Sequence, residues 1–385
     1  MQFLPFFIVL CVGLFFSEFF SRLHVPWVVA LVFAGVLLSL GSFSDFLTDN
    51  TVVSFFSEIG LVFLMFIAGL ETRFNQFRHI PKRTITITLI NGLIPFAVGV
   101  LIGFLFGFSV ITSVLIGIIF ISSSIAVIVP AMHEKKLFSQ EIGKVIIQST
   151  IINDIVSLLL LSLVIQKTAT LTSLPILLYL VILVSVVVFL KWFIPRFIMF
   201  FNRVTFSKQT EHESSLRLVF VVLIGSVLLF QVLGMHPIIA GFFTGLVISE
   251  SRISSGLRKQ INTLAYGLFI PMFFVVVGSS LDISLLWTTT GALLFTLVIV
   301  FGSSLAKYLS GFWAGRLAGF SVIESKILGS STIPQLSTTL ATVFAGVSLG
   351  IVPPILETAL IVLSVVSTLI APFLINYFTS RFQSV

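Results

Sequence analysis

The feature that most constrains this chain is a series of long apolar runs that recurs from one end to the other. Hydrophobic residues make up 57% of the 385 residues and only 9% are charged, whereas a soluble domain carries about 25% charged residues. Several runs reach about 18 residues or more, the length at which a helix crosses the hydrocarbon core of a bilayer. Because a helix satisfies its backbone hydrogen bonds internally, the sequence predicts an all-α membrane protein surrounded by lipid.

Breaks between the apolar runs predict about thirteen transmembrane helices. Their expected ranges are 3–22, 25–40, 52–71, 84–107, 109–133, 140–165, 174–201, 215–234, 236–250, 262–280, 286–318, 321–349 and 354–380. We expect residues 1–385 to form a single transmembrane domain, with no soluble regulatory domain.

Positive charge is distributed unevenly among the predicted loops. Of the 21 Lys and Arg residues, all but Lys167, Lys191 and Lys307 lie in or beside the loops that follow odd-numbered spans. Since cytoplasmic loops carry the excess of Lys and Arg, we predict the N-terminus outside and the C-terminus in the cytoplasm, in a prokaryotic cell membrane. The formal net charge of +7 follows from this asymmetry, so it does not indicate binding to nucleic acid.

Two ionisable residues lie deep within predicted spans. Asp154 is near the middle of the span at 140–165, and Lys307 lies well inside the span at 286–318. An acid at the bilayer centre costs roughly 2.5–3.5 kcal/mol on insertion scales, so it should face a water-filled cavity or a partner. A buried Asp that serves packing alone is the alternative. One deep acid and one deep base suggest a shared polar centre.

Two spans have the composition of discontinuous helices. The fifth contains FISSSIAVIVP, with Ser122, and the twelfth contains GSSTIPQLSTTLA, with Pro334, Gln335 and Ser337. Clustered hydroxyls near a proline favour unwinding, because proline lacks an N–H and hydroxyls can pair with the freed backbone groups. A continuous, kinked helix is the alternative for each span. Breaks in corresponding spans of two halves indicate an inverted-repeat transporter with a site near the membrane midplane.

Several motifs along nearly the whole chain resemble those of the monovalent cation:proton antiporter superfamily. The second and third spans contain HVPWVVALVFAGVLL and GLVFLMFIAGLE, and the sixth contains STIINDIVS. The later spans contain HPIIAGFFTGLVIS, FIPMFFVVVGSSLDI and AKYLSGFWAGRLAG. The order and spacing of these motifs are similar to those of Na⁺/H⁺ exchangers and of the membrane domain of Kef-type transporters.

This resemblance implies an inverted repeat with two crossed discontinuous helices, and separate core and dimerisation domains. The core would comprise approximately 84–165 and 286–380 plus part of 52–71, and it would move like an elevator within a homodimer. The residues implied at the site of Na⁺ and proton binding are Asp154, Asn153, Thr150, Ser123 and Ser124, with Lys307 as a charge partner in the core.

A carboxylate suits antiport because it holds either a proton or a metal cation, but not both. Na⁺ is a hard ion that prefers oxygen ligands, which the Asp154 carboxylate, hydroxyl groups and carbonyls of unwound helix would supply. We therefore expect exchange of Na⁺ or Li⁺ for H⁺, electroneutral and one for one, with a role in pH homeostasis. No cofactor is expected beyond the transported ions.

The chain departs from the family pattern at two places. Electrogenic branches typically carry Asp-Asp where this chain has Asn153-Asp154, and electroneutral branches often carry Arg where it has Lys307. Kef-type relatives carry Gly-Gly-Glu at the second discontinuity, where this chain has QLS beginning at Gln335. The stoichiometry and the choice of cation are therefore the least constrained features.

Two other functions remain as alternatives at this stage: K⁺/H⁺ antiport of the Kef type, and a passive cation channel. A channel would need a continuous lined pore, and the sequence has one deep acid and no ring of acids. An intramembrane enzyme is not expected, because Cys11 is isolated and the His residues lack the spacing of metal ligands.

Overall fold

The computed structural model describes residues 3–22, 25–39, 50–72, 80–134, 137, 140–168, 175–204, 211–250 and 255–383. Every regular element in these ranges is helical. Six of the loop charges behind the predicted orientation lie outside the described residues: Arg73, Arg78, Lys135, Lys136, Lys208 and Arg252.

The first six spans follow the predicted ranges closely. They are α1 (Phe3–Ser21), α2 (Trp27–Ser39), α4 (Thr51–Glu71), α5 (Lys82–Leu105), α6 (Val110–Ile121) with α7 (Ile125–Glu134), and α8 (Glu141–Thr168).

The remaining spans do so as well. They are α9 (Ile176–Val204), α10 (Glu211–Val232), α11 (Pro237–Glu250), α12 (Ser255–Leu264) with the π-helix η3 (Ala265–Phe269) and α13 (Ile270–Ser279), α15 (Ala292–Leu317), α16 (Val322–Thr332) with α17 (Ser337–Ser348), and α18 (Pro354–Gln383). A short helix, α14 (Leu285–Thr288), precedes α15.

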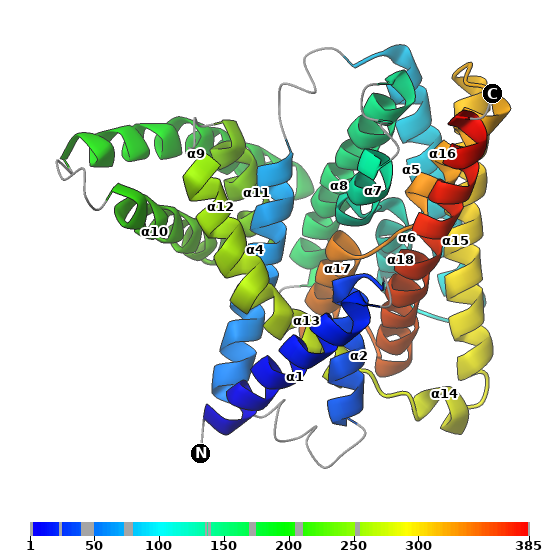
Figure 1. The fold of residues 1–385 in the computed structure, drawn as a ribbon, viewed down its shortest axis with the longest axis horizontal. Helices are drawn as coiled ribbons and strands as arrows, with labels where there is room; N and C mark the ends of the chain where they lie inside the picture. Colours follow the sequence, from blue (N-terminus) through cyan, green and yellow to red (C-terminus); the bar gives the residue numbers. More distant parts are fainter. Residues whose placement is uncertain are drawn as a thin grey trace.

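The prediction of about thirteen spans is thus confirmed for the described residues. Ten segments are long and apolar enough to cross a membrane by themselves, and α2 and α11 are shorter apolar helices. The remaining span is the pair α16 and α17. The marked ends of the chain lie at opposite ends of the bundle (Figure 1), as an odd number of spans requires.

Both predicted discontinuities are present. Residues 122–124 separate α6 from α7, and residues 333–336 separate α16 from α17. The first break is formed by the serines themselves, while Pro130 lies within α7. The second contains Pro334, which lacks the N–H needed to continue the ladder of α16. The two broken spans are the fifth and the twelfth, so they cross the membrane in opposite directions, as an inverted repeat requires.

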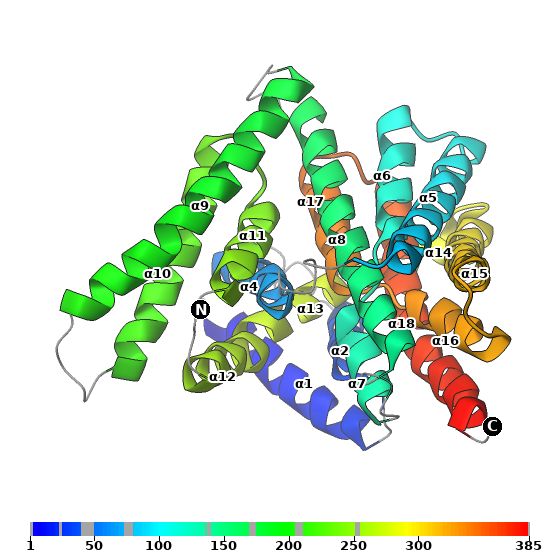
Figure 2. The same cartoon turned by 90° about the horizontal axis from the view of Figure 1, so that it is seen from above.

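The helices form two groups that meet along the middle of the molecule. Figures 1 and 2 place α9, α10 and α11 on one side and α5, α15 and α16 on the other. Within the first group α4 packs on α11 and α13; within the second, α5 packs on α6 and α15, and α16 packs on α15 and α18.

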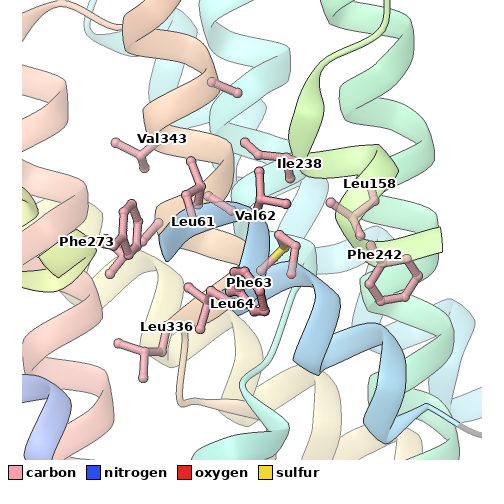
Figure 3. Packing of buried hydrophobic residues seen from close by; sticks show 14 of the residues in the cluster. Leu61, Val62, Phe63, Leu64, Leu158, Ile238, Phe242, Phe273, Leu336 and Val343 are labelled. Carbon is pink, nitrogen blue, oxygen red and sulfur yellow. The ribbon is translucent and has the colours of Figure 1, made fainter. Parts of the chain in front are cut away.

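An apolar layer lies where the groups meet. Figure 3 shows buried side chains of α4, among them Leu61 and Phe63, close to Val343 of α17 and Phe242 of α11. All four belong to one continuous hydrophobic cluster. Helix α4 therefore packs within the first group and also contacts the broken span of the second.

Candidate functional site

The two discontinuities contact each other directly. The Ser124 N–H donates a hydrogen bond to the Pro334 carbonyl over 2.6 Å, and the Ser123 hydroxyl donates to the Thr332 carbonyl over 2.9 Å. The hydroxyls of Ser122 and Thr339 are 2.9 Å apart. Backbone groups freed by unwinding at membrane depth need partners within the protein. Here each break supplies partners for the other.

Asp154 lies against the first discontinuity. Its side chain comes from the middle of α8, which packs on α5, α6, α7 and α16, and the residue is only 8% exposed. The Ser123 N–H points at Asp154 Oδ1 across 3.3 Å. The carboxylate therefore faces the unwound backbone inside the protein, not the surrounding lipid.

Lys307 lies on the same break but is not ion-paired to Asp154. It is fully buried on α15, and its Nζ donates to the Ile121 carbonyl over 2.6 Å and to Asn91 Oδ1 over 3.4 Å. Ion pairs within the described residues include Arg83–Glu141 and Lys191–Glu250, and neither belongs to this centre.

The Lys307 ammonium thus binds the last carbonyl of the half-helix α6. The C-terminal end of a helix carries partial negative charge and carbonyls without intrahelical partners. A buried cation at this end is attracted by the partial negative charge and donates a hydrogen bond to one of these carbonyls. Ile121 and Ser123 are two residues apart, so Lys307 and Asp154 contact one short stretch of backbone. The two side chains also lie close enough to interact electrostatically.

The hydroxyls predicted as cation ligands differ in their availability. Ser123 Oγ is engaged with the second break, whereas Thr150 Oγ1 and Ser124 Oγ are buried and have no hydrogen-bond partner. Thr150 lies one helical turn before Asp154 and therefore on the same face of α8. An unpaired buried hydroxyl costs about 1–3 kcal/mol, so a water molecule or a cation at these two oxygens would be stabilised.

Asn153 faces a different neighbour from Asp154. A Cβ atom at Gly92 of α5 would lie 3.1 Å from Asn153 Oδ1, so a side chain at residue 92 would crowd the amide. Asn153 is buried, and its amide oxygen lies against α5 beside the site.

Asn91, which was not among the residues predicted from the sequence, connects this region to α15. Its Nδ2 donates to the Lys307 carbonyl over 3.2 Å and to Ser310 Oγ over 2.9 Å, while its Oδ1 accepts from Lys307 Nζ. The sequence does carry a signal for Asn91, because it is a lone amide inside the apolar run at 84–107 and polar groups in spans face the protein interior.

The remaining predicted residues lie in the second discontinuity. Pro334 and Gln335 are buried, and Ser337 is half-buried as the first residue of α17. Gln335 Nε2 donates to Ser303 Oγ over 3.0 Å. Thus the structure brings the predicted residues of both breaks, α8 and α15 into one polar centre.

The donor atoms of this centre suit a hard monovalent cation. They are one carboxylate, hydroxyls and backbone carbonyls, which are the oxygen ligands that alkali and alkaline-earth ions prefer. In the ranges that the structure covers, no group of three or more His, Cys, Asp or Glu side chains is placed to hold a metal ion. The chemistry is therefore unlike that of a transition-metal site.

Comparison with known proteins places this geometry in a family. The family model described as "Sodium/hydrogen exchanger, transmembrane" matches residues 6–380. A probable Na⁺/H⁺ antiporter of Methanocaldococcus jannaschii is 28% identical over 97% of this chain and 95% of its own length. A Na⁺/H⁺ antiporter of Enterococcus hirae is 27% identical, over 95% of this chain and 94% of its own.

A solved structure has the same fold. The sodium proton antiporter MjNhaP1 from M. jannaschii superposes with a TM-score of 0.69 at 17% identity, covering 97% of this chain and 96% of the other. The family match spans almost the entire sequence and agrees with the resemblance seen in the motifs, so the chain belongs to the transmembrane sodium/hydrogen exchanger family, a family of multi-pass membrane transporters and not of enzymes.

Proposed function

We propose that this protein is a secondary antiporter that exchanges Na⁺ or Li⁺ for H⁺ at Asp154. The observation that carries the proposal is the position of this buried carboxylate against the first discontinuity, beside the unpaired hydroxyls of Thr150 and Ser124. The names of the two relatives, both Na⁺/H⁺ antiporters, support the choice of ions.

One titrating group supports electroneutral exchange. Asp154 is the only acid among the buried residues that the structure describes, and Asn153 beside it does not ionise. The Lys307 side chain is held by a helix end, and in this proposal it keeps its positive charge through the cycle. Asp154 then carries either one proton or one Na⁺, and the site has the same net charge on both passages across the membrane.

We propose that the two helix groups are the two bodies of an elevator, a transport core that moves and a scaffold that stays in place. The core comprises α5–α8 and α15–α18, and the scaffold comprises α1, α2, α4 and α9–α13. The part of 52–71 that the family resemblance implied for the core lies in α4, which we assign to the scaffold because α4 packs mainly on α11 and α13. Helices within each body pack with their backbones in close contact. Gly245 of α11 has no room for a Cβ beside the Phe66 carbonyl of α4. A Cβ at Gly99 of α5 would lie 2.8 Å from Gly117 Cα of α6.

The contacts between the two bodies can break and form again as the core moves past the scaffold. Besides the apolar layer around α4, the Ser280 hydroxyl donates to Glu357 Oε1 over 2.9 Å, and Ser348 Oγ lies 3.5 Å from His236 Nε2. All four residues are at the end of the molecule where even-numbered spans finish, which the distribution of Lys and Arg assigns to the outside. With this orientation the N-terminus is outside and the C-terminus is cytoplasmic, and a homodimer remains a prediction from the family resemblance.

The cost of desolvating Asp154 couples the transport of Na⁺ to the transport of H⁺. An empty, ionised Asp154 would have to cross an apolar layer as a charged group, which is costly. Binding of a proton or a cation neutralises the carboxylate and lowers this cost. The core therefore crosses only when it is loaded, and the two ion fluxes depend on each other.

A cation panel in proteoliposomes with an imposed pH gradient tests the proposal. Na⁺ and Li⁺ should dissipate the gradient in wild type, and the Asp154→Asn variant should be inactive. Asp282→Asn is the matched control, because Asp282 is an exposed loop acid whose carboxylate accepts hydrogen bonds from the nearby Ser284. A response to K⁺ alone would favour the Kef-type alternative, and cation flux indifferent to the pH gradient would indicate a channel.

Stoichiometry is tested by clamping the membrane potential with K⁺ and valinomycin. One-for-one exchange should run at the same rate at zero potential and at an imposed potential. A rate that rises or falls directly with potential would contradict electroneutral exchange, while leaving Asp154 as the exchange site.

A further inference from the structure

Gln335 hydrogen-bonds to several helices around the crossing of the two discontinuities. The unwinding of a helix alone would not need these bonds. It is fully buried between α16 and α17. Its Nε2 donates to Ser303 Oγ of α15 over 3.0 Å and, at 3.5 Å, to the Phe120 carbonyl of α6. Its backbone N–H donates to Ser367 Oγ of α18 over 3.1 Å. One residue therefore connects the second break to three other helices.

The contact with α6 is made at the end of that half-helix. The carbonyls of the last turn of α6 lack intrahelical partners because the break begins at Ser122. Lys307 takes the carbonyl of Ile121 and Gln335 takes that of Phe120. These two donors, one charged and one neutral, hydrogen-bond to adjacent carbonyls at the same helix end.

The two donors are also held together on α15. Ser303, the acceptor for the Gln335 amide, lies one helical turn before Lys307 and hence on the same face of α15. The α6 end that they hold leads directly to Ser123, whose N–H points at Asp154. A shift of this end would move the Asp154 donor and the Lys307 acceptor together.

The contacts at residue 335 need a neutral hydrogen-bond donor, which the amide supplies through Nε2, while its Oε1 is buried without a partner. A carboxylate of the same length would present only acceptors to the Phe120 carbonyl and would compete for the Lys307 ammonium. An apolar side chain would leave the Phe120 carbonyl without its donor. The amide is neutral, so it holds the helix end without adding a second charge to the centre.

We propose that Gln335 is a positioning residue of the ion site, which acts through Ser303 and the end of α6 to keep Ser123 and Lys307 in register with Asp154. This inference rests on the antiport proposed above. It assigns to the second discontinuity a part in setting the affinity of the site for the cation, although Asp154 contacts the first.

The test compares Gln335→Met, Ser303→Ala and the double variant in Na⁺-driven proton exchange. A hydrogen bond contributes about 1 kcal/mol, and each 1.4 kcal/mol is tenfold in affinity. Ser303→Ala loses the 3.0 Å bond and should raise the Na⁺ concentration for half-maximal exchange about fivefold. Gln335→Met loses this bond and the longer 3.5 Å contact to the Phe120 carbonyl, which adds little, so it should raise the concentration by a similar factor, about fivefold. The double variant should equal Gln335→Met, because both changes remove one connected unit.

The pattern of rates separates positioning from folding. A positioning role raises the KM for Na⁺ and leaves the maximal rate per folded protein within about twofold, whereas a loss of folding lowers the amount of active protein at constant KM. Gln231→Met, at the exposed end of α10, is the matched control and should behave as wild type. If Gln335→Met does not fold, Ser303→Ala carries the test by itself, because it keeps Gln335 and removes only its partner on α15.

Two outcomes would overturn the proposal: an unchanged KM in well-folded Gln335 and Ser303 variants, or additive effects in the double variant. Both outcomes can be observed only if wild type exchanges Na⁺ for H⁺. Either would therefore contradict the proposed role of Gln335 and leave the antiport function standing. Absence of Na⁺-driven exchange in wild type would instead contradict the antiport function itself.

Discussion

Replacing Lys307 by Met should destabilise the protein but leave exchange in place. In this account the ammonium holds the end of α6 and does not travel through a cycle of charge states. Methionine has nearly the same length and fits the same buried space. It cannot donate to the Ile121 carbonyl, which is 2.6 Å from Nζ in the structure.

The magnitude follows from the contacts of the ammonium. A hydrogen bond from a charged donor contributes about 1.5–3 kcal/mol, and the longer contact to Asn91 Oδ1, at 3.4 Å, adds little. Removing a buried charge also removes its desolvation penalty, which offsets part of the loss. The free energy of unfolding should therefore fall by about 1–3 kcal/mol.

Chemical denaturation in detergent micelles measures the stability, and the vesicle assay measures exchange. Lys191→Met is the matched control, because Lys191 makes a half-exposed ion pair with Glu250 and such pairs contribute about 0–1 kcal/mol. An Lys307→Met protein that is as stable as wild type but inactive would refute the reasoning, since Lys307 would then act in the ion cycle and not as a support for α6.

Two further perturbations test other parts of the account. Thr150→Val removes a buried hydroxyl without a partner, so it should leave stability within about 1 kcal/mol of wild type and raise the Na⁺ concentration for half-maximal exchange several-fold. Cysteines in place of Ser280 and Glu357, in a chain whose only native thiol is changed by Cys11→Ser, should form a disulfide that stops exchange by joining core to scaffold. Reduction should restore the rate.

The control for the disulfide is a cysteine pair within one body. Thr112 Oγ1 donates to the Ile351 carbonyl over 3.2 Å, and both residues belong to the proposed core at the same end of the molecule. Cross-linking cysteines at these two positions should not slow exchange. Full activity with a complete cross-link between the positions of Ser280 and Glu357 would show that the boundary between the bodies does not move there.

The fold was predictable from sequence to the extent that lipid dictates it. Apolar runs set the spans, and the serines at 122–124 and Pro334 marked both breaks, because the penalty for unpaired backbone in lipid leaves few alternatives. The π-helical turn η3 in the tenth span was not anticipated. Its last residue, Phe269, packs against Gly60 and the Phe63 ring, which are contacts between distant segments that no local pattern specifies.

The site was predictable in its residues but not in its connections. Asp154 and Lys307 stood out because charge is rare at membrane depth, and their placement at one break followed the expectation. The partner of Lys307 is a backbone carbonyl, and Ser123 reaches Asp154 with its N–H and not its hydroxyl. Backbone groups look alike in every sequence, so only the crossing of the chains could reveal which of them serve the site.

The central claim is that one carboxyl group holds either a proton or a sodium ion. The most direct measurement is proton release on Na⁺ binding by purified protein in weakly buffered detergent solution, at a pH where wild type is protonated before the addition. The account predicts one proton released for each Na⁺ bound by wild type, and neither binding nor release by Asp154→Asn. Sodium binding without proton release in wild type, or undiminished release in the Asn variant, would contradict it.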